Sequence, residues 1–444
     1  MKKNINVGII GLGTVGTGVV KLMKKNISLI EHKAGAKINI KRICDRDANR
    51  FKVLRKYGFS HEIFTNDADD IIQDRDIDIV IELIGGYEPA RTFILSAITS
   101  GKHVVTANKA LLAKYWKEIF KEANKHKVSV YIEASVGGGI PIIQVLNEGL
   151  SANRIKSILG ILNGTTNYIL TKMSRDKMDF KKALAEAKKH GFAEADASFD
   201  INGTDAANKL VVLGSIAFGA HIAPDEVYCE GIGKIMREDI QYAAEEFGYI
   251  LKLLAILKNN GKVIDVRVHP TLIPKDHPLC SVEDEYNAVY VVGDASGDTM
   301  YYGRGAGEMP TASAVVSDVI YLSKNIHNDI AGKAPYIQCN PFRKLKIMDI
   351  RNISMKYYIR INSVDRPGVL SKISGLLGKH NVSIASVYQM AHANKKKTVP
   401  IVLVTHTAKE GDVKKALAEM DRLSIVKEKS IMIRIEDSDE GTLQ

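Results

Sequence analysis

The sequence predicts an α/β protein that opens with a doubly wound parallel sheet and continues into further domains. Its 444 residues suffice for about three domains of ordinary size. Hydrophobic residues make up 45% of the chain and charged residues 25%, so a packed core is available. Over residues 5–140, short apolar runs alternate with charged, helix-like stretches, which is typical of a parallel sheet with helices on both faces.

The first domain is expected to comprise residues 1–134. Its strands are predicted at the apolar runs, and its helices, among them residues 14–25 and 110–125, lie between them. The predicted strands are residues 6–10, 38–44, 77–83, 103–106 and 128–133.

The pattern changes near residue 135, and a second, α+β domain is expected over 135–302. A cluster of glycines opens it, and prolines divide its last part into strands and loops. Its predicted elements are a helix over 142–148, a strand over 158–170, helices over 179–190 and 203–218, and strands within 263–302. Beyond it, a helix over 311–324 is expected to pack back on the first domain. About 303–324 would thus complete that domain, and 325–352 form a connector.

Residues 353–436 form a self-contained pattern. Their order, strand–helix–strand–strand–helix–strand, is that of the ferredoxin-like unit. The expected elements are a strand over 357–363, a turn over 365–368, a helix with Leu370, Ile373, Leu376 and Leu377 on one face, strands over 382–389 and 399–407, a helix over 412–422 and a strand over 424–434.

Composition excludes several classes of protein. No apolar run approaches the roughly 20 residues that cross a bilayer, and the N-terminus has no small-residue cleavage site. The net charge of +11 comes from lysines spread among acidic residues, without the basic–aromatic pattern typical of nucleic-acid binding. The four cysteines lie far apart in the sequence and include no C-x-x-C pair, so they predict neither a disulfide framework nor a zinc site. They are Cys44, Cys229, Cys280 and Cys339. We therefore expect a cytoplasmic protein with no membrane or nucleic-acid partner.

A glycine-rich turn follows the first predicted strand and opens the first predicted helix. This is the context that dinucleotide binding requires, and the G-x-G-x-x-G match consists of Gly11, Leu12, Gly13, Thr14, Val15 and Gly16. The turn would place a pyrophosphate at the helix N-terminus, as in a Rossmann-type domain. After the second strand, Asp45 is typical of NAD binding, whereas Arg46 suits the 2′-phosphate of NADP, so the cofactor is NADP or NAD.

Three charged residues are candidates for the chemistry. Lys109 follows a predicted strand closely, and the carboxyl ends of parallel strands face the ligand crevice. Asp205 and Lys209 lie four positions apart on a predicted helix, so their side chains can meet. Such pairs are common on surfaces, but the apolar run 210–213 favours a buried or cleft-facing lysine. On spacing alone, a catalytic role and a surface role both stay open.

Five sequence segments together are similar to the homoserine dehydrogenases. They are GLGTVG, TANKALL, EASVGGGIPII, LNGTTNYIL and, most specifically, GFAEADASFDINGTDAANKL at 191–210. The resemblance covers residues 5–320 and implies NAD(P)-dependent interconversion of L-aspartate 4-semialdehyde and L-homoserine, a step in threonine, methionine and isoleucine biosynthesis. It also implies a homodimer or homotetramer, with 135–302 as the substrate-binding and dimerisation domain. Because the glycine motif begins at residue 11, we expect a monofunctional enzyme with no kinase portion before it.

The resemblance assigns catalytic roles to three residues. Lys209 would donate the proton that the carbonyl oxygen needs after hydride delivery, and Asp205 would position it. Lys109 would be a second cation, beside the carbonyl and the nicotinamide. Two ammonium groups so close together would lower each other's pKa.

The resemblance also assigns binding residues. Glu194 would bind the substrate ammonium with help from Asp200, and backbone amides around Asn163, Gly164 and Thr165 would bind the substrate carboxylate. Gly307 lies in a segment that resembles the family's loop returning to the cofactor. The EASVGGG segment resembles the family's monovalent-cation site, since hard cations take oxygen ligands and glycines let carbonyls converge. Spacing alone predicts only a tight turn there, and the implied Na⁺ ligands are the carbonyl oxygens of Glu133, Val136, Gly138 and Ile140.

Residues 353–436 resemble an ACT domain, with the telling motif DRPGVL at 365–370. Such domains often bind amino acids where the turn meets the helix N-terminus, facing a neighbouring strand edge. The expected effector is threonine, acting as an inhibitor, which requires that it bind the less active state more tightly. A dimerisation module without a ligand is the alternative. The effector residues implied by the resemblance are Asp365, Gly368, Val369, Asn381 and Ile384.

Two rival functions are less consistent with the sequence. Another amino-acid-pathway dehydrogenase with an ACT tail is disfavoured by the 191–210 segment. A catalytically idle amino-acid sensor, binding its ligand through the ACT domain, is disfavoured because Lys109, Asp205 and Lys209 are all present.

Overall fold

The computed structural model describes residues 2–261, 263–337, 345–389 and 398–437. The chain folds into two compact units, each assembled from three separate segments. The first unit consists of Met1–Leu162, Asp205–Val227 and Tyr286–Leu345, and the second of Asn163–Thr204, Tyr228–Glu285 and Lys346–Gln444.

The first unit contains a parallel sheet with the strand order β3-β2-β1-β4-β5-β6. Its strands are β1 (Asn4–Ile10), β2 (Lys37–Cys44), β3 (Phe64–Thr65), β4 (Ile79–Glu82), β5 (His103–Thr106) and β6 (Val130–Tyr131). Because strand order reverses between β1 and β4, the carboxyl ends of these two strands border the crevice where such sheets bind ligands. This confirms the predicted doubly wound α/β class.

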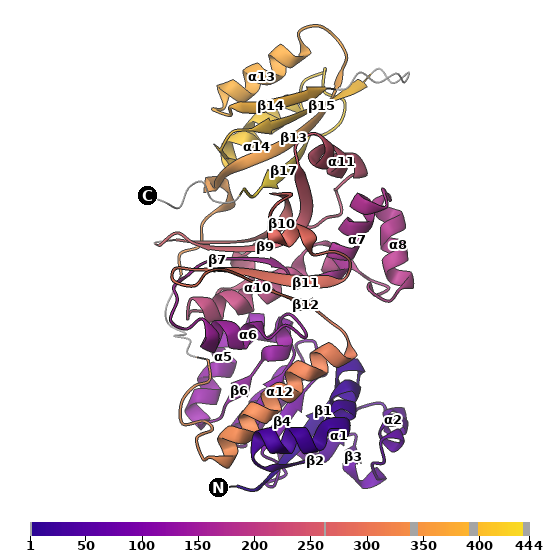
Figure 1. Ribbon diagram of the computed structural model, residues 1–444, viewed down its shortest axis with the longest axis vertical. Helices are drawn as coiled ribbons and strands as arrows, with labels where there is room; N and C mark the ends of the chain where they lie inside the picture. Colours follow the sequence, from indigo (N-terminus) through magenta and orange to yellow (C-terminus); the bar gives the residue numbers. More distant parts are fainter. Residues whose placement is uncertain (1, 262, 338–344, 390–397, 438–444) are drawn as a thin grey trace. The chain divides into compact units, whose positions relative to one another are not determined.

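Helices cover this sheet. They are α1 (Thr14–Ala34), α2 (Phe51–Lys56), α3 (Asp69–Ile72), α4 (Ala90–Thr99), α5 (Lys109–His126) and α12 (Glu308–His327). Helices α1 and α12 lie side by side (Figure 1), and their apolar faces share one core with β1 and β2. A segment far along the chain therefore packs on the first domain, as the apolar pattern of 311–324 predicted.

The rest of the first unit is α+β. It comprises a short helix α6 (Ile142–Gln144), the helix α10 (Thr204–Ala217) and three antiparallel strands in the order β12-β11-β7. These strands are β7 (Ile155–Ile161), β11 (Tyr286–Gly293) and β12 (Gly297–Arg304). The predicted helix over 142–148 is α6 followed by a π turn, Val145–Gly149.

The second unit combines a helical segment with a mixed sheet. Its helices are α7 (Gly164–Arg175), α8 (Phe180–Lys189), α9 (Ser198–Ile201), α11 (Arg237–Glu245), α13 (Val369–Lys379) and α14 (Glu410–Met420). The sheet runs β9-β10-β17-β13-β15-β14, with β8 (Tyr228–Cys229) beside β10 and β16 (Ala408–Lys409) beside β13. The main strands are β9 (Tyr249–Asn259), β10 (Ile264–Pro274), β13 (Ser354–Val364), β14 (Ile384–Gln389), β15 (Thr398–Thr405) and β17 (Ile431–Ile435).

The C-terminal part of this sheet has the predicted ferredoxin-like form. Strands β17, β13, β15 and β14 are antiparallel neighbours, and α13 and α14 share a core with them. The last strand, β17, also pairs in parallel with β10, with Arg434 opposite Thr271 and Ile435 opposite Leu272. The C-terminal strand thus joins the ACT-like fold to a strand that precedes it by about 160 residues.

Some elements differ from the prediction for local reasons. Residues 164–170, predicted as strand, begin α7, because the Asn163 side chain accepts a hydrogen bond from the Thr166 amide at 2.8 Å and caps the helix. The predicted strand 128–133 is shortened to β6 by the turn Glu133–Ser135. The predicted strand 424–434 begins only at Ile431.

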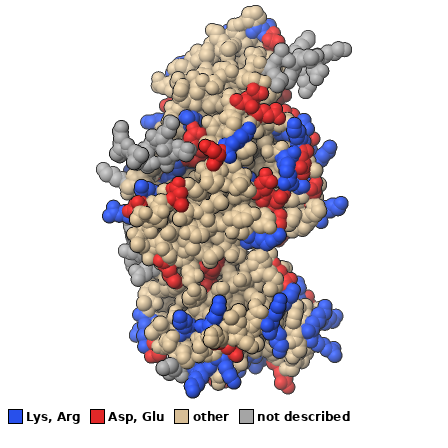
Figure 2. All heavy atoms as spheres, in the orientation of Figure 1, with Lys and Arg blue, Asp and Glu red and all other residues tan. Residues whose placement is uncertain are grey.

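The charged surface and the cysteines agree with what the amino-acid composition predicts. Figure 2 shows basic and acidic side chains interspersed on the face drawn. Cys44, Cys229 and Cys280 are free thiols, while Cys339, and 338–344 of the predicted connector, lie outside the described residues. None of the helices within the described ranges is long and apolar enough to cross a membrane. We retain 1–134, 135–302 and 353–436 as a proposal for the domain limits.

Candidate active site

Helix α10 carries a buried acid–base pair. Asp205 and Lys209 lie one turn apart, and the Lys209 ammonium donates to the Asp205 Oδ2 at 2.7 Å. It also donates to the carbonyl oxygen of Leu162 at 2.6 Å. The two side chains are only 9% (Lys209) and 5% (Asp205) exposed, so the pair is not a solvated surface pair. The predicted contact is confirmed.

Lys109 joins the same carboxylate from another helix. It is the first residue of α5, whose N-terminus is capped by Asn108, and its Nζ lies 2.9 Å from the Asp205 Oδ1. Its side chain is 35% exposed, against 9% for Lys209. One carboxylate therefore bridges two ammonium groups and offsets their mutual repulsion. The arrangement offers a buried proton donor and a more accessible cation at one point.

The glycine turn has the geometry of a dinucleotide loop. Gly11 has φ +103°, and a Cβ on Gly16 would lie 2.1 Å from the Gly11 carbonyl oxygen, so α1 packs tightly on the turn. A Cβ on Gly13 would meet nothing within 4 Å, and no side chain caps α1, which Thr14 and Val15 begin. Open space in front of a helix N-terminus suits a pyrophosphate. These residues fit a bound dinucleotide.

The residues after β2 organise this loop. Asp45 accepts hydrogen bonds from the Leu12 amide at 2.7 Å and from the Asp47 amide at 2.9 Å. The Leu12 amide therefore already has a hydrogen-bond acceptor in Asp45. The next residue, Arg46, is exposed. Both residues are at the carboxyl end of β2, where a ribose is bound in such folds.

Gly307 lies close to the helix that follows the glycine turn. It precedes α12 with φ +122°. A Cβ on Gly18 of α1 would lie 2.7 Å from the carbonyl oxygen of Glu308, the first residue of α12. The 303–307 loop is thus held against the helix that follows the glycine turn.

The expected substrate-binding residues all belong to the second unit. The Asn163 side chain donates to the Asp200 Oδ1 at 2.7 Å, and the Thr165 hydroxyl donates to the Phe192 carbonyl oxygen at 2.5 Å. These bonds bring the 192–200 segment to the N-terminus of α7, where Gly164 begins the helix. Glu194 is exposed on that segment. The structure thus gathers this group of predicted residues.

The expected cation loop is tightly folded. Gly137 and Gly138 have φ values of +76° and +56°, which favour glycine. A Cβ on Gly138 would lie 2.7 Å from the Gly305 carbonyl oxygen. The loop is therefore compact enough for several carbonyls to converge. Within the described ranges, no group of three or more His, Cys, Asp or Glu could hold a metal ion.

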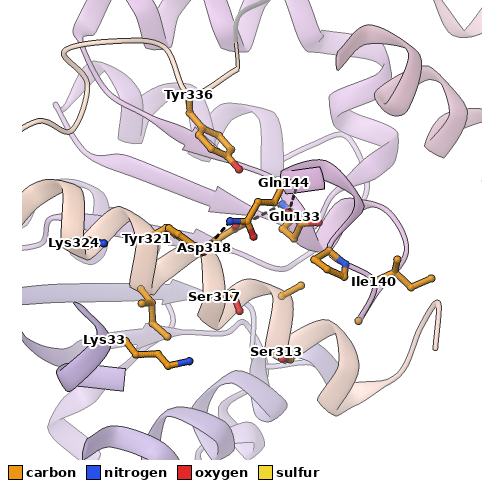
Figure 3. A pocket seen from close by; sticks show the side chains of 14 residues that line it. Lys33, Glu133, Ile140, Gln144, Ser313, Ser317, Asp318, Tyr321, Lys324 and Tyr336 are labelled. Atoms are coloured by element: carbon orange, nitrogen blue, oxygen red, sulfur yellow. Dashed lines mark hydrogen bonds between the residues drawn. The ribbon is translucent and has the colours of Figure 1, made fainter. Parts of the chain in front are cut away.

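The Glu133 side chain fastens the same loop. Its two oxygens accept hydrogen bonds from the Ile143 and Gln144 amides, both at 2.9 Å, and burial raises its pKa to about 7. The Glu133 amide donates to Asp318, also at 2.9 Å. Figure 3 shows Glu133, Gln144 and Asp318 together in a cavity of about 490 Å³, which Ile140 also lines.

The predicted effector residues fall into two groups at opposite ends of α13. Asp365 and Gly368 precede the helix, Val369 begins it, and Gly368 has φ +85°. Asn381, with φ +58°, follows its C-terminal end, and Ile384 begins β14. A helix of 11 residues is about 16 Å long, so one chain does not bring the two groups together.

Several residues around Lys109 could not be predicted, or were not predicted, from the sequence. The Leu162 carbonyl is a backbone group, which no side-chain pattern reveals. Asn108, Glu82 and Thr106 were not singled out, although polar residues at the carboxyl ends of buried strands are a recognisable signal.

Comparison with known proteins agrees with this geometry. Family models match residues 11–133 ("Homoserine dehydrogenase, NAD binding domain"), 141–320 ("Homoserine dehydrogenase") and 357–424 ("ACT domain"). A homoserine dehydrogenase of Neisseria gonorrhoeae is 42% identical over 98% of this chain and 99% of its own. The chain belongs to the homoserine dehydrogenase family.

Solved structures of homoserine dehydrogenases share the fold. One from Thiobacillus denitrificans is 43% identical, with a TM-score of 0.92 over 98% of this chain and 99% of its own. A hyperthermophilic archaeal homoserine dehydrogenase in complex with NADPH is 27% identical, with a TM-score of 0.60 over 71% of this chain and 97% of its own. As a homoserine dehydrogenase family member, the chain is an oxidoreductase with a domain for a nicotinamide nucleotide and a C-terminal ACT domain. The resemblance stated from the sequence is confirmed.

Proposed function

We propose that the protein interconverts L-aspartate 4-semialdehyde and L-homoserine with NAD or NADP, in threonine, methionine and isoleucine biosynthesis. One observation supports this above the others: in this family member, Asp205 holds the ammonium groups of Lys209 and Lys109 on its two oxygens, at 2.7 and 2.9 Å. Reduction of an aldehyde leaves negative charge on its oxygen, which a cation with a transferable proton can neutralise.

Each residue has a distinct task in this mechanism. The nicotinamide nucleotide supplies the hydride when it is bound. Lys209 gives a proton to the substrate oxygen and takes it back in the reverse reaction. Asp205 holds Lys209 in place, and Lys109 stabilises the oxygen's developing charge. The Leu162 carbonyl fixes the direction of the Lys209 ammonium.

The substrate's own charges select it. Glu194 binds the ammonium group, with Asp200 held by Asn163 beside it. The first amides of α7, at Gly164 and Thr165, bind the carboxylate, since a helix N-terminus favours anions. An aldehyde without the amino-acid group would lack both contacts.

Two further ligands are part of the proposal. The carbonyl oxygens of Glu133, Val136, Gly138 and Ile140 hold a monovalent cation, Na⁺, supported by the positive φ angles of the loop. Threonine binds the ACT domain as an inhibitor. The two residue groups at opposite ends of α13 support an effector site shared between copies in a homodimer or homotetramer.

Absorbance at the reduced-nicotinamide band tests the reaction. Homoserine is supplied with NAD⁺ or NADP⁺, with NaCl present, and with or without threonine. We expect homoserine-dependent reduction, and the ratio of the two rates decides between the Asp45 and Arg46 preferences. No turnover with either nucleotide, in a folded sample that binds threonine, would favour the idle-sensor function.

The cation is tested without turnover. We expect the melting temperature to rise with NaCl more than with choline chloride at equal ionic strength. Equal effects of the two salts would contradict a cation site.

A further inference from the structure

Glu82 is a buried carboxylic acid at the ligand edge of the parallel sheet. It is the last residue of β4, an otherwise apolar strand, and its exposure is 0%. Burying a carboxylate is costly unless hydrogen bonds compensate, and burial raises the pKa of Glu82. The mechanism above gives this group no task.

The Glu82 carboxyl joins the segments that follow β4 and β5. Its Oε1 accepts hydrogen bonds from the Ile84 amide at 2.8 Å and the Gly85 amide at 3.3 Å. Its Oε2 accepts a hydrogen bond from the hydroxyl of Thr106, the last residue of β5, at 2.6 Å. Glu82 and Thr106 are direct partners in the β4–β5 register. One side chain therefore fixes two loops at the carboxyl edge.

The connection continues to Lys109. The Thr106 hydroxyl accepts from the Asn108 amide at 3.0 Å, and the Asn108 side chain donates back to the Gly86 carbonyl at 2.7 Å. Asn108 also caps α5, accepting from the Leu111 amide at 3.2 Å. The ring of bonds from Glu82 through Thr106 and Asn108 to the 84–86 turn thus ends at the residue before Lys109.

The same turn supports the dinucleotide loop. A Cβ on Gly11 would lie 2.8 Å from both the Ile84 Cγ2 and the Leu83 carbonyl carbon. Ile10 of β1 is the register partner of Glu82 in β4. Glu82 is therefore at the point where strand order reverses, beside the loop that fits the pyrophosphate.

We propose that Glu82, acting through Thr106, is a positioning residue that aligns Lys109 with the nicotinamide side of the dinucleotide site. This rests on the proposed function. Glu82 does not touch the substrate, and its effect is on the 84–86 turn and the start of α5.

Three variants test the proposal. Glu82→Gln keeps the size of the side chain but replaces one acceptor oxygen with a donor. Thr106→Val keeps the shape but removes the hydroxyl, and Thr106→Ser retains it. We expect Glu82→Gln and Thr106→Val to lower kcat with homoserine about ten- to hundredfold and to weaken NADPH binding, with Thr106→Ser close to wild type.

A matched control lies at the other end of the same strand. Asp78 immediately precedes β4 and accepts a hydrogen bond from the Asn6 amide at 3.0 Å. Asp78→Asn should leave kcat and NADPH binding unchanged. Steady-state kinetics, fluorescence titration with NADPH and melting temperature are measured for all four variants.

The outcomes separate this proposal from the proposed function. A lower melting temperature with unchanged kcat and NADPH affinity would show that Glu82 and Thr106 are merely structural and would overturn the inference. Loss of kcat in Thr106→Ser equal to that in Thr106→Val would overturn it too. If wild type fails to oxidise homoserine, the proposed function is wrong, but the NADPH titration still tests the role of Glu82. Weaker NADPH binding in Glu82→Gln and Thr106→Val than in wild type supports that role, and equal binding contradicts it.

Discussion

Asp205 uses both carboxylate oxygens, each against a different lysine, so the positions of the two cations depend on one residue. Removing either lysine leaves a carboxylate that is 5% exposed with one partner fewer. The two lysines nevertheless have separate proposed tasks, and they differ in exposure, since Lys209 is buried and Lys109 is 35% exposed. Variants of each should therefore differ in kinetics.

Lys209→Met should lower kcat by about 10²- to 10⁴-fold, the usual contribution of a positioned proton donor. NADPH affinity should stay near wild type, since Lys209 lies on α10 and not in the dinucleotide loop that precedes α1. Kinetics and fluorescence titration measure both. Lys102→Met is the matched control: its buried ammonium donates hydrogen bonds to the carbonyl oxygens of Asp74 and Ile77, and kcat should be retained. A Lys209→Met enzyme with normal kcat would remove the proton-donor role.

Glu194→Ala should mainly raise the KM for homoserine, with a smaller change in kcat. A charge-assisted hydrogen bond contributes about 1.5–3 kcal/mol, which is roughly a ten- to hundredfold change in KM. Asp196, an exposed carboxylate two residues after Glu194, serves as the control. Asp196→Asn keeps an acceptor oxygen for the Ser198 amide and should leave the KM unchanged. An unchanged KM in Glu194→Ala would place Glu194 outside the pocket.

The sequence predicted part of this site for clear reasons. The Asp205–Lys209 contact follows from helical spacing, and the glycine turn from its pattern. The Lys109–Asp205 contact joins residues 96 positions apart, and only the fold shows that they share a carboxylate. At Glu82 the sequence shows only a polar residue at the end of an apolar run, because the amides of Ile84 and Gly85 that bind it are backbone groups without a residue signature.

At the scale of elements, β5 is held by a histidine that must stay neutral. The Ser129 amide, just before β6, donates to the His103 Nδ1 at 3.0 Å, and burial lowers the pKa of His103 to about 4. Because the folded pKa is below the unfolded value of about 6.5, the stability it confers is complete above pH 6.5 and is lost as pH falls through 4.

His103→Asn should remove this pH dependence, because the asparagine oxygen can accept the same hydrogen bond but does not titrate. The free energy of unfolding of wild type, relative to His103→Asn, should fall by about 3 kcal/mol between pH 7 and pH 4. Urea unfolding across this range measures it. Parallel pH profiles for the two proteins would contradict the assignment.

Helix α11 is joined to β13 by a buried ion pair. The Arg360 Nε donates to the Asp239 Oδ1 at 2.6 Å, and the Tyr358 hydroxyl donates to the same oxygen at 3.1 Å. Asp239→Asn should destabilise the second unit by about 3–5 kcal/mol, because it leaves a buried guanidinium unpaired. Asp239→Leu combined with Arg360→Met should cost less than the sum of the single changes. Urea unfolding followed by circular dichroism measures the free energy of unfolding of the two single variants and the double variant. If the losses of the single variants add up to that of the double variant, the pair is not coupled.

The elements themselves were predicted unevenly. The predicted strand 103–106 coincides with β5, because its two central residues, Val104 and Val105, are apolar and fully buried. The segment 164–170 was misassigned because its apolar residues suit a strand equally well, and the Asn163 cap decides for α7. β9 was not predicted: its sequence mixes lysines with leucines, and Lys252 is buried there by hydrogen bonds from its ammonium to Asn167 and to the Val282 carbonyl.

At the scale of the whole molecule, the proposed effector site of the ACT domain requires a second copy of the chain. Asp365 precedes α13 and Asn381 follows it, and the helix between them is about 16 Å long. A site that used both would take Asp365 from one chain and Asn381 from another. Inhibition and self-association are therefore expected to be linked.

Asn381→Ala should reduce inhibition by threonine while kcat without threonine is unchanged. The residue is exposed after α13 and far from Lys209 in the sequence, so the basal reaction does not require it. Initial rates over a threonine series measure the effect, and Lys372→Ala, on the exposed face of α13, is the control. Identical threonine curves for Asn381→Ala and wild type would remove Asn381 from the effector site.

The pairing of β17 with β10 limits the ways in which the proposed inhibition by threonine could be lost. Two further contacts accompany the β17–β10 pairing. The Glu436 amide donates to the Leu272 carbonyl oxygen at 2.8 Å, and Arg434 pairs with Glu230 at 2.8 Å. A chain that lost β17 would expose the edge of β10. It would also leave the buried carboxylate of Glu410 without its partner Arg434. A nonsense mutation near the end of the gene would thus yield an aggregating protein and not an unregulated one. Variants freed from feedback are expected to arise by single substitutions inside the ACT domain.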